Sequence, residues 1–257
     1  MAKMSRKEKE KWKNLSSKPL TMDFILENKE YLDFKLVCKH SILDQKFIEE
    51  NLIDYVDWTA LTLYQNIDKE FIWNNAQKVN WVSVSYSKDL TVDHLEKYKS
   101  MLDWKTVIIR HKYEEETLIK FKKYIDWQQV CIYQKLSVDF IKEHHLLLFP
   151  FKYEIAKYQK LSEEYLEENK DNLDWDIISE YQTLSEDFID KMSDYVNWTW
   201  ITEKQKMTKK FIMSHLDKLN LYRLMTSKRY IPSDLKKSDL YYICNYYNTN
   251  KKYNSAS

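Results

Sequence analysis

The sequence contains no glycine and only three prolines and three cysteines among its 257 residues. Without glycine the chain cannot build the phosphate-binding loops of the Walker and Rossmann kinds, because those loops need a backbone that approaches phosphate closely. The cysteines lie far apart and form no CxxC pair, which predicts ordinary buried thiols in a reducing compartment rather than a disulfide framework. The composition therefore argues against nucleotide-binding enzymes of these two classes.

Long apolar runs are also missing. No stretch of about 18 apolar residues occurs, so no transmembrane helix is expected. The N-terminus is charged and lacks the apolar segment of a signal peptide. We therefore expect an intracellular protein.

A pattern that recurs every 23 or 24 residues fills most of the chain. Its marker is an aromatic residue that follows an acid or an amide, found at Trp58, Trp81, Trp104, Trp127, Trp175 and Trp198, with Phe34 before them and Leu221 after them. Self-similarity at a fixed period of this size is typical of stacked-repeat proteins.

Each unit predicts two short helices. In the clearest unit, Asp174 is placed to cap a helix that begins at Trp175 and carries Ile178 on the same face. The pair Leu184-Ser185 then starts a second helix, which contains Phe188-Ile189. Helices this short are not stable alone, so the units must stack. The sequence predicts an all-α solenoid of about nine short two-helix repeats.

The pattern also predicts the organisation of the chain. We expect a basic N-terminal arm or cap at 1–19, with Trp12 covering the first repeat, and a C-terminal capping unit at 221–247 that ends in a helix over 240–247. A disordered tail is expected at 248–257. Between them lies the array at 20–220, which begins with a half unit at Leu20 and has full units near 34, 58, 81, 104, 127, 152, 175 and 198. Replacing the tryptophan of one unit, as in Trp104→Ala, is expected to cost about 3 to 5 kcal/mol.

Two units are degenerate. His94 and Thr117 stand where phenylalanine is usual, and Lys88 and His111 stand where glutamine is usual. We interpret His94 as a packed histidine rather than a metal ligand, because no second ligand lies at metal spacing beside it.

The unit near 152 is irregular. Lys152 takes the tryptophan position and Phe149-Pro150-Phe151 is inserted before it. Pro150 predicts an extended Phe149 and a bend in the stack. The insertion is either a structural accommodation or an exposed anchor, formed by Phe149 and Phe151, for a partner.

A glutamine recurs near the end of the first helix, often after tyrosine, at Gln65, Gln134, Gln159, Gln182 and Gln205. One interpretation is that it bonds the free carbonyls at the helix end, in a protein that lacks glycine caps. The other is that a ladder of glutamine and tyrosine reads one nucleotide per repeat. The first is favoured because the middle of the chain is acidic.

Charge is uneven along the chain. Residues 1–20 carry a net charge of +5 and residues 204–257 a net charge of +9, which leaves −13 for the residues between them. An acidic body is a poor track for nucleic acid. A local contact remains open at the basic C-terminal third, through Arg223, Lys228 and Arg229.

Catalytic, metal and cofactor motifs are not apparent. The adjacent pair His144-His145 resembles a metal site only superficially, since neighbouring residues on a helix point in different directions. No serine, histidine and aspartate pattern stands out. We therefore expect no enzyme activity and no cofactor.

Residues 174–189 read Asp-Trp-x-x-Ile-Ser-x-Tyr-Gln-x-Leu-Ser-x-x-Phe-Ile, and 126–141 match in part. This pattern resembles short helical repeats in uncharacterised proteins of large DNA viruses, including giant viruses and large phages. The resemblance covers about residues 20–220 and implies a helical repeat protein, placed in the host cytoplasm or in a virion. It implies no activity and assigns no functional residues.

Together these observations predict a non-enzymatic protein-interaction scaffold of viral origin. Its partner would be a host or viral protein, bound either by a counter-defence inhibitor or by a particle component. The alternative is a nucleic-acid-binding repeat protein that uses the basic C-terminal third.

Overall fold

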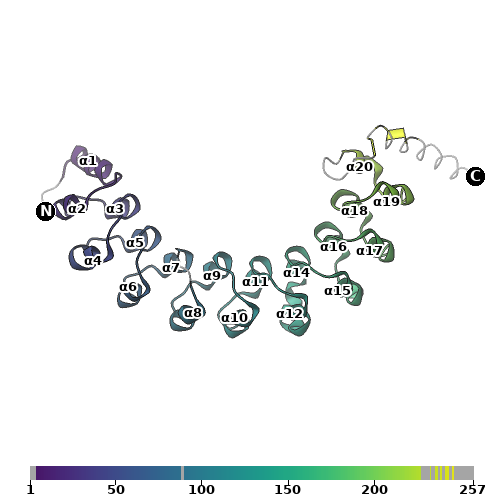
Figure 1. Cartoon of the computed structure of the whole chain (residues 1–257), viewed down its shortest axis with the longest axis horizontal. Coiled ribbons are helices and arrows are strands. Elements are labelled where there is room, and N and C mark those ends of the chain that lie inside the picture. The colour runs from purple at the N-terminus through teal and green to yellow at the C-terminus, as the bar shows by residue number, and fades with distance from the viewer. Residues whose placement is uncertain are drawn as a thin grey trace, which may run out of the picture. The chain divides into compact units, whose positions relative to one another are not determined.

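A computed structural model describes residues 4–87 and 90–226 and the single residues Pro232, Leu235, Lys236, Ser238, Tyr241, Tyr242 and Asn245. Within these residues all regular structure is helical, as the sequence predicts. The chain divides into two compact units, Met1–Asp126 and Trp127–Ser257. Each unit is a stack of short helix pairs, and the first and second helix of a pair are called helix A and helix B below (Figure 1).

Unit 1 places its A helices in one row and its B helices in another (Figure 1). The A helices are α1 (Arg6–Ser16), α3 (Phe34–His40), α5 (Trp58–Tyr64), α7 (Trp81–Ser87) and α9 (Trp104–Arg110). The B helices are α2 (Met22–Asn28), α4 (Gln45–Phe47) continued by the π-helical η1 (Ile48–Leu52), α6 (Lys69–Asn74), α8 (Val92–Tyr98) and α10 (Glu115–Lys120). Each A helix packs against the next A helix.

Unit 2 repeats this arrangement (Figure 1). Its A helices are α11 (Trp127–Tyr133), α14 (Lys152–Tyr158), α16 (Trp175–Tyr181), α18 (Trp198–Lys204) and α20 (Leu221–Thr226), again packed in sequence. Its B-side elements are α12 (Val138–Glu143), α13 (His145–Leu148), η2 (Phe149–Phe151), α15 (Glu163–Glu168), η3 (Lys170–Asn172), α17 (Glu186–Lys191) and α19 (Lys209–Ser214). None of the described helices in either unit is both long and apolar enough to span a bilayer.

The predicted caps explain why these short helices form. The Asp57 carboxylate accepts the Ala60 N–H at 2.7 Å at the start of α5, and the Ser185 hydroxyl accepts the Phe188 N–H at 3.2 Å at the start of α17. Such bonds satisfy donors that have no partner inside the helix. Asp103 departs from the prediction, because its carboxylate bonds the Thr106 hydroxyl and no backbone N–H.

The core combines aliphatic residues with buried phenylalanines, while several tryptophans lie at its edge. Ile178 and Ile189 are fully buried, as are the equivalent aliphatic residues of other repeats. Trp127 and Trp175 are buried, but Trp58, Trp81, Trp104 and Trp198 are only half-buried. The indole lies at the edge of the core because its N–H needs a partner. In Trp175 this N–H donates to the Lys170 carbonyl at 2.8 Å.

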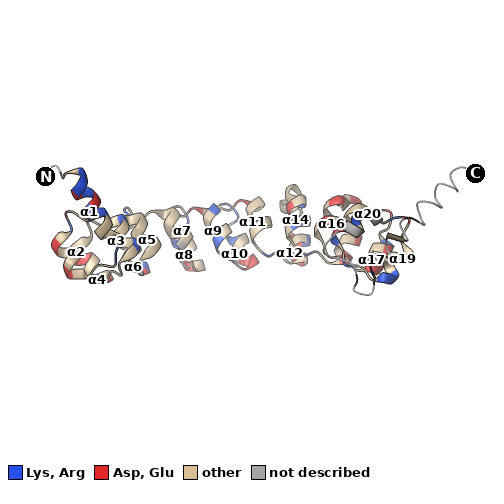
Figure 2. Ribbon diagram, turned by 90° about the horizontal axis from the view of Figure 1, so that it is seen from above, with Lys and Arg blue, Asp and Glu red and all other residues tan. Residues whose placement is uncertain are grey.

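The N-terminal segment is a full helix A and not a loose arm, so the first repeat is complete rather than a half unit. Ser5 and Glu8 form a capping box at the start of α1. Trp12 stacks on Tyr31 of the first repeat with ring centroids 5.2 Å apart. Ser16 accepts the Asp33 N–H at 2.9 Å. In Figure 2 much of the α1 ribbon has the blue colour of Lys and Arg.

The two degenerate repeats move their aromatic residue by one helical turn. Tyr98, four residues after His94, packs on Trp81 at 5.1 Å, and Phe121, four residues after Thr117, packs on Trp104 at 5.1 Å. Positions four apart lie on the same face of a helix, so the tryptophan keeps a ring partner.

The expected extended backbone at Phe149 is wrong. Phe149 is helical (φ −52°, ψ −40°), and Pro150 falls in the first turn of η2, where a missing N–H costs no hydrogen bond. The insertion adds α13 and η2 to the B side, while α14 still packs against α11.

Several sequence predictions lie outside the described residues. These are Lys88, Lys228, Arg229, Cys244, most of the capping unit at 221–247 and the tail at 248–257.

Candidate protein-binding surface

The recurring glutamine joins each repeat to the one before it. Gln182 Oε1 accepts the Leu161 N–H at 3.0 Å, while its Nε2 donates to the carbonyls of Ala156 at 2.6 Å and Gln159 at 2.8 Å. Gln65, Gln159 and Gln205 each make the same three bonds to the equivalent backbone groups of the repeat before them. These bonds satisfy carbonyls at the end of the preceding helix A, where glycine caps are absent.

Burial and full bonding decide between the two interpretations of the glutamine ladder. Gln65, Gln159, Gln182 and Gln205 are all buried. An amide whose oxygen and nitrogen both hold backbone groups has no edge left for a base. The structural interpretation is confirmed for these four glutamines, because each amide is buried against backbone groups of the preceding repeat.

Substitutes at the same position work on the same principle. His111 Nε2 lies 2.7 Å from the Ser85 carbonyl, as Gln205 Nε2 lies 3.1 Å from the Ser179 carbonyl. Ser41 accepts the Leu20 N–H at 3.0 Å. A short hydroxyl or an imidazole thus replaces part of the glutamine bonding.

Where a tyrosine precedes the glutamine, it points away from the core. Tyr133, Tyr158 and Tyr181 are exposed, and they form what we call the tyrosine row of unit 2. The glutamine that follows is the extended C-cap residue of the helix and is buried, whereas the tyrosine is the last helical residue and is exposed.

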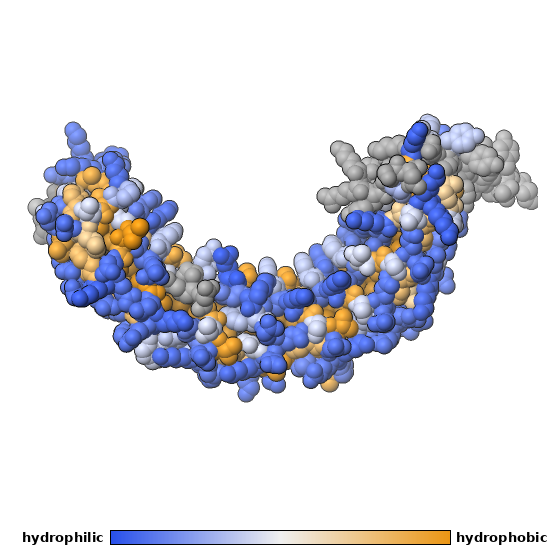
Figure 3. Space-filling view, viewed as in Figure 1, coloured by the Kyte–Doolittle hydropathy of each residue, from blue (hydrophilic) through white to orange (hydrophobic). Residues whose placement is uncertain are grey.

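A lysine lies beside this row. Lys157 Nζ is 4.7 Å from the Tyr181 ring centroid and 5.3 Å from that of Tyr158. A hydrogen bond with Tyr181 is the main cause that raises the pKa of the Lys157 ammonium. The arrangement gives the ends of α14 and α16 a surface that is both aromatic and cationic. Figure 3 shows apolar side chains of the units as patches among hydrophilic ones.

The irregular repeat contains an open pocket, called the Lys152 pocket below. Its volume is about 280 Å³. The lining is mostly apolar and includes Ile141, Leu148, Ile155, Leu161 and Tyr165, with the exposed residues His145, Phe149 and Lys152 at the rim. Burial is the first cause that raises the pKa of the Tyr165 hydroxyl.

The predicted partner-binding residues separate in the structure. Phe149 is 65% exposed and lines the Lys152 pocket, whereas Phe151 is half-buried and does not line it. Arg223 forms an ion pair with Glu203 of α18. Sequence reasoning missed the pocket, although Lys152 in a tryptophan position was its signal.

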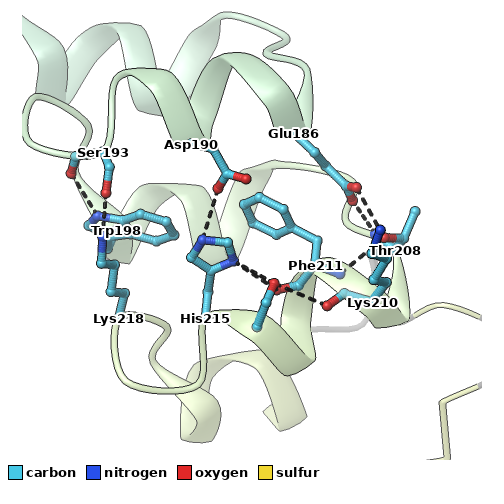
Figure 4. Close-up of polar contacts among 10 residues, drawn as sticks. Glu186, Asp190, Ser193, Trp198, Thr208, Lys210, Phe211, His215 and Lys218 are labelled. Atoms are coloured by element: carbon cyan, nitrogen blue, oxygen red, sulfur yellow. Dashed lines mark hydrogen bonds and ion pairs between the residues drawn. The ribbon is translucent and has the colours of Figure 1, made fainter.

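Ser214, His215 and Asp190 are the residue types of a hydrolase triad but do not have its geometry. Figure 4 shows His215 facing Asp190. His215 Nε2 lies 2.8 Å from Asp190, and its Nδ1 lies 3.1 Å from the Ser214 hydroxyl and 2.9 Å from the Phe211 carbonyl. A carbonyl only accepts, so Nδ1 carries a proton and cannot take one from serine. The ring stacks on Trp198 of its own repeat at 5.3 Å, and its contact with Asp190 joins it to the preceding repeat.

His94 and His144 also make contacts within the fold. His94 Nδ1 accepts the Thr91 N–H at 3.0 Å as part of a helix cap, and burial is the main cause that lowers its pKa. His144 stacks on Phe140 at 4.3 Å. Cys38 and Cys131 are buried. Over residues 4–87 and 90–226, no three metal-ligating side chains of the His, Cys, Asp and Glu types are grouped to hold an ion.

No known protein family, no curated protein and no solved structure matches the chain. Function is therefore inferred from the geometry of the chain alone.

Proposed function

We propose that the chain is a non-enzymatic scaffold that binds a protein partner through the tyrosine row of unit 2. The observation that carries this proposal is the regular exposure of Tyr133, Tyr158 and Tyr181 on successive A helices, while the neighbouring glutamines are buried. Tyrosine is enriched in protein interfaces because it offers a large apolar ring and a polar tip.

Rigidity favours this surface. Tyr158 and Tyr181 each precede a glutamine fixed by three backbone bonds, so their helix ends are held in place. A surface that is ordered before binding loses less conformational entropy on association. Lys157 between the rings favours a partner with acidic groups near its contact residues.

The resemblance to repeats of large DNA viruses supports a finer proposal. The partner is a host or viral protein, and the scaffold either blocks it as a counter-defence factor or organises it in a particle. The two roles differ in the partner: an inhibited host enzyme loses activity when the scaffold is added, whereas a particle protein co-purifies with virions.

A double variant tests the tyrosine row. Wild type and Tyr158→Ala/Tyr181→Ala are immobilised, and proteins captured from host lysate are quantified by mass spectrometry. We expect wild type to retain one protein in stoichiometric amount and the double variant to lose it, with unchanged melting because the side chains are exposed. The control is Tyr124→Ala, an exposed tyrosine of unit 1 outside the row.

Nucleic-acid binding gives the opposite result. Retention on immobilised RNA or DNA at low salt, lost steeply as salt rises, together with no captured protein, would refute the proposal in favour of the basic C-terminal third.

A further inference from the structure

The Lys152 pocket lies where other repeats hold their own indole ring. In the next repeat, Trp175 packs against Phe188 at 6.4 Å and against Tyr195 at 5.6 Å between ring centroids. Trp198 packs on Phe211 at 6.4 Å in the same way. The space between helix A, helix B and the following turn is thus built for an aromatic ring.

The irregular repeat lacks two of the three rings that fill this space. The residues 23 positions before Trp175, Phe188 and Tyr195 are Lys152, Tyr165 and Asn172. All three line the pocket. Two aromatic side chains are therefore replaced by a flexible cation and a short amide, and a cavity remains.

The pocket has the size and lining for a ring. An apolar cavity of about 150 Å³ binds benzene in a protein core. The Lys152 pocket has a volume of about 280 Å³ and contains Ile141, Leu148, Ile155 and Leu161. This volume suits a larger ring system such as indole, and the Tyr165 ring supplies an aromatic wall.

The rim adds a charge requirement. Lys152 Nζ lies 5.6 Å from the Phe149 ring centroid and makes no ion pair with any residue that the structure describes. His145 is also exposed at the rim. A carboxylate beside the entering ring would meet the ammonium of Lys152.

We propose that the Lys152 pocket binds an indole side chain of a protein partner, with a carboxylate next to that indole. The inference rests on the proposed scaffold function and adds the chemistry of a second contact. The partner's tryptophan takes the place that Trp175 and Trp198 occupy in their own repeats.

Small probes test the pocket without knowledge of the partner. N-acetyltryptophan and N-acetyltryptophanamide are titrated into the full chain, and the methyl resonances of Ile, Leu and Ala are followed by NMR. We expect saturable shifts at Ile141, Leu148, Ile155 and Leu161, with millimolar affinity of the order expected for so few atoms. The acid should bind about two- to fivefold more tightly than the amide at low salt.

Two variants at one position make the test decisive. Lys152→Trp fills the pocket from within and should reduce probe affinity at least about tenfold. Lys152→Met should keep indole binding and lose the preference for the acid. Wild type without shifts at these methyl groups, or Lys152→Trp with undiminished binding, would overturn the proposal.

Failure here is separable from failure of the proposed function. Tyr158→Ala/Tyr181→Ala should bind both probes as wild type does, because neither tyrosine lines the pocket. Loss of lysate capture with normal probe binding would implicate only the tyrosine row.

Discussion

Two neighbouring repeats of unit 2 have the same backbone plan and different contents. The repeat at 175–197 holds Trp175 against its second helix, whereas the repeat at 152–174 has Lys152 in that position and an open pocket. Both are joined to the preceding repeat by a glutamine with three backbone bonds, Gln182 in one and Gln159 in the other.

The comparison shows which positions hold the repeat together. Buried Ile155 and Ile178 and the two glutamines are common to both repeats, whereas the tryptophan is not, so the helix pair forms without it. The tryptophan adds edge packing and can be replaced when the neighbouring residues adjust. That freedom makes the tryptophan position a place where a binding pocket can arise.

The largest expected effect comes from giving the regular repeat the residue of the irregular one. Trp175→Lys should lower the free energy of unfolding by about 3 to 5 kcal/mol, because a buried ring and its bond to the Lys170 carbonyl are lost. Urea denaturation measures the change. Lys152→Ala is the matched control and should stay within about 0.5 kcal/mol. Equal losses of free energy of unfolding in the two variants would contradict the view that only the regular repeat depends on the side chain at this position.

Removal of the shared glutamine should affect both repeats alike. Gln182→Leu and Gln159→Leu each leave one buried N–H and two buried carbonyls without their partner, and we expect a loss of about 2 to 4 kcal/mol in each. The same denaturation experiment applies, with Tyr181→Ala as an exposed control. A loss at only one of the two positions would contradict the common role.

Converting the irregular repeat to the regular type should stabilise it. Lys152→Trp fills part of a cavity of about 280 Å³ and is expected to add about 0.5 to 2 kcal/mol. Differential scanning calorimetry would record a higher Tm. Lys152→Met, which fills less of the cavity, should give a smaller rise, and a lowered Tm for Lys152→Trp would mean that the space does not accept an indole.

The smallest expected effect extends the comparison to unit 1, where Cys38 occupies the position of Ser179. Burial is the first cause that raises the pKa of the Cys38 thiol from 9.0 to about 12. The Cys38 thiol therefore loses its proton at a higher pH in the folded protein than in the unfolded chain. Its contribution to the free energy of unfolding is complete below pH 9 and declines as the pH rises towards 12.

Cys38→Ser should remove that part of the alkaline loss and change stability at pH 7 by less than about 1 kcal/mol. Unfolding curves at pH 7 and above pH 9 compare the two proteins. Native Cys38 should also resist iodoacetamide until denaturant is added, because the thiolate is the reactive form. Rapid alkylation of Cys38 in the folded protein would contradict the burial.

The helix pairs could be predicted because their causes are local. Asp57 and Ser185 cap helices through residues only three positions away, and Ile178 follows Trp175 at helical spacing. Trp12 and Ser16 have the same spacing as Trp175 and Ser179 and could have predicted α1. Trp12 follows a lysine instead of an acid or an amide, so the repeat pattern was not recognised there. In the two degenerate repeats the aromatic residue lies four positions after the one where phenylalanine is usual, at Tyr98 and Phe121. That spacing was the only sign of the shift in the sequence.

The surface and the pocket could not be predicted because their causes lie one repeat away. The Gln182 amide bonds residues 21 to 26 positions earlier, so its burial, and the exposure of Tyr181 that follows from it, depend on stacking. The Lys152 pocket depends on Asn172 and Tyr165 together. The sequence located Phe149 as a candidate anchor, but its helical backbone required the first-turn position of Pro150 to be known.

The direction of the glutamine bonds has a consequence for the order in which the chain matures. The backbone N–H of Leu161 bonds to Gln182, and that of Leu184 bonds to Gln205. Each of these N–H groups therefore lacks its partner until a residue of the next repeat has been synthesised. On the ribosome, a newly emerged repeat therefore keeps open polar groups until its successor leaves the exit tunnel. Repeats should therefore fold in order from the N-terminal side, each one after the repeat that follows it has been synthesised.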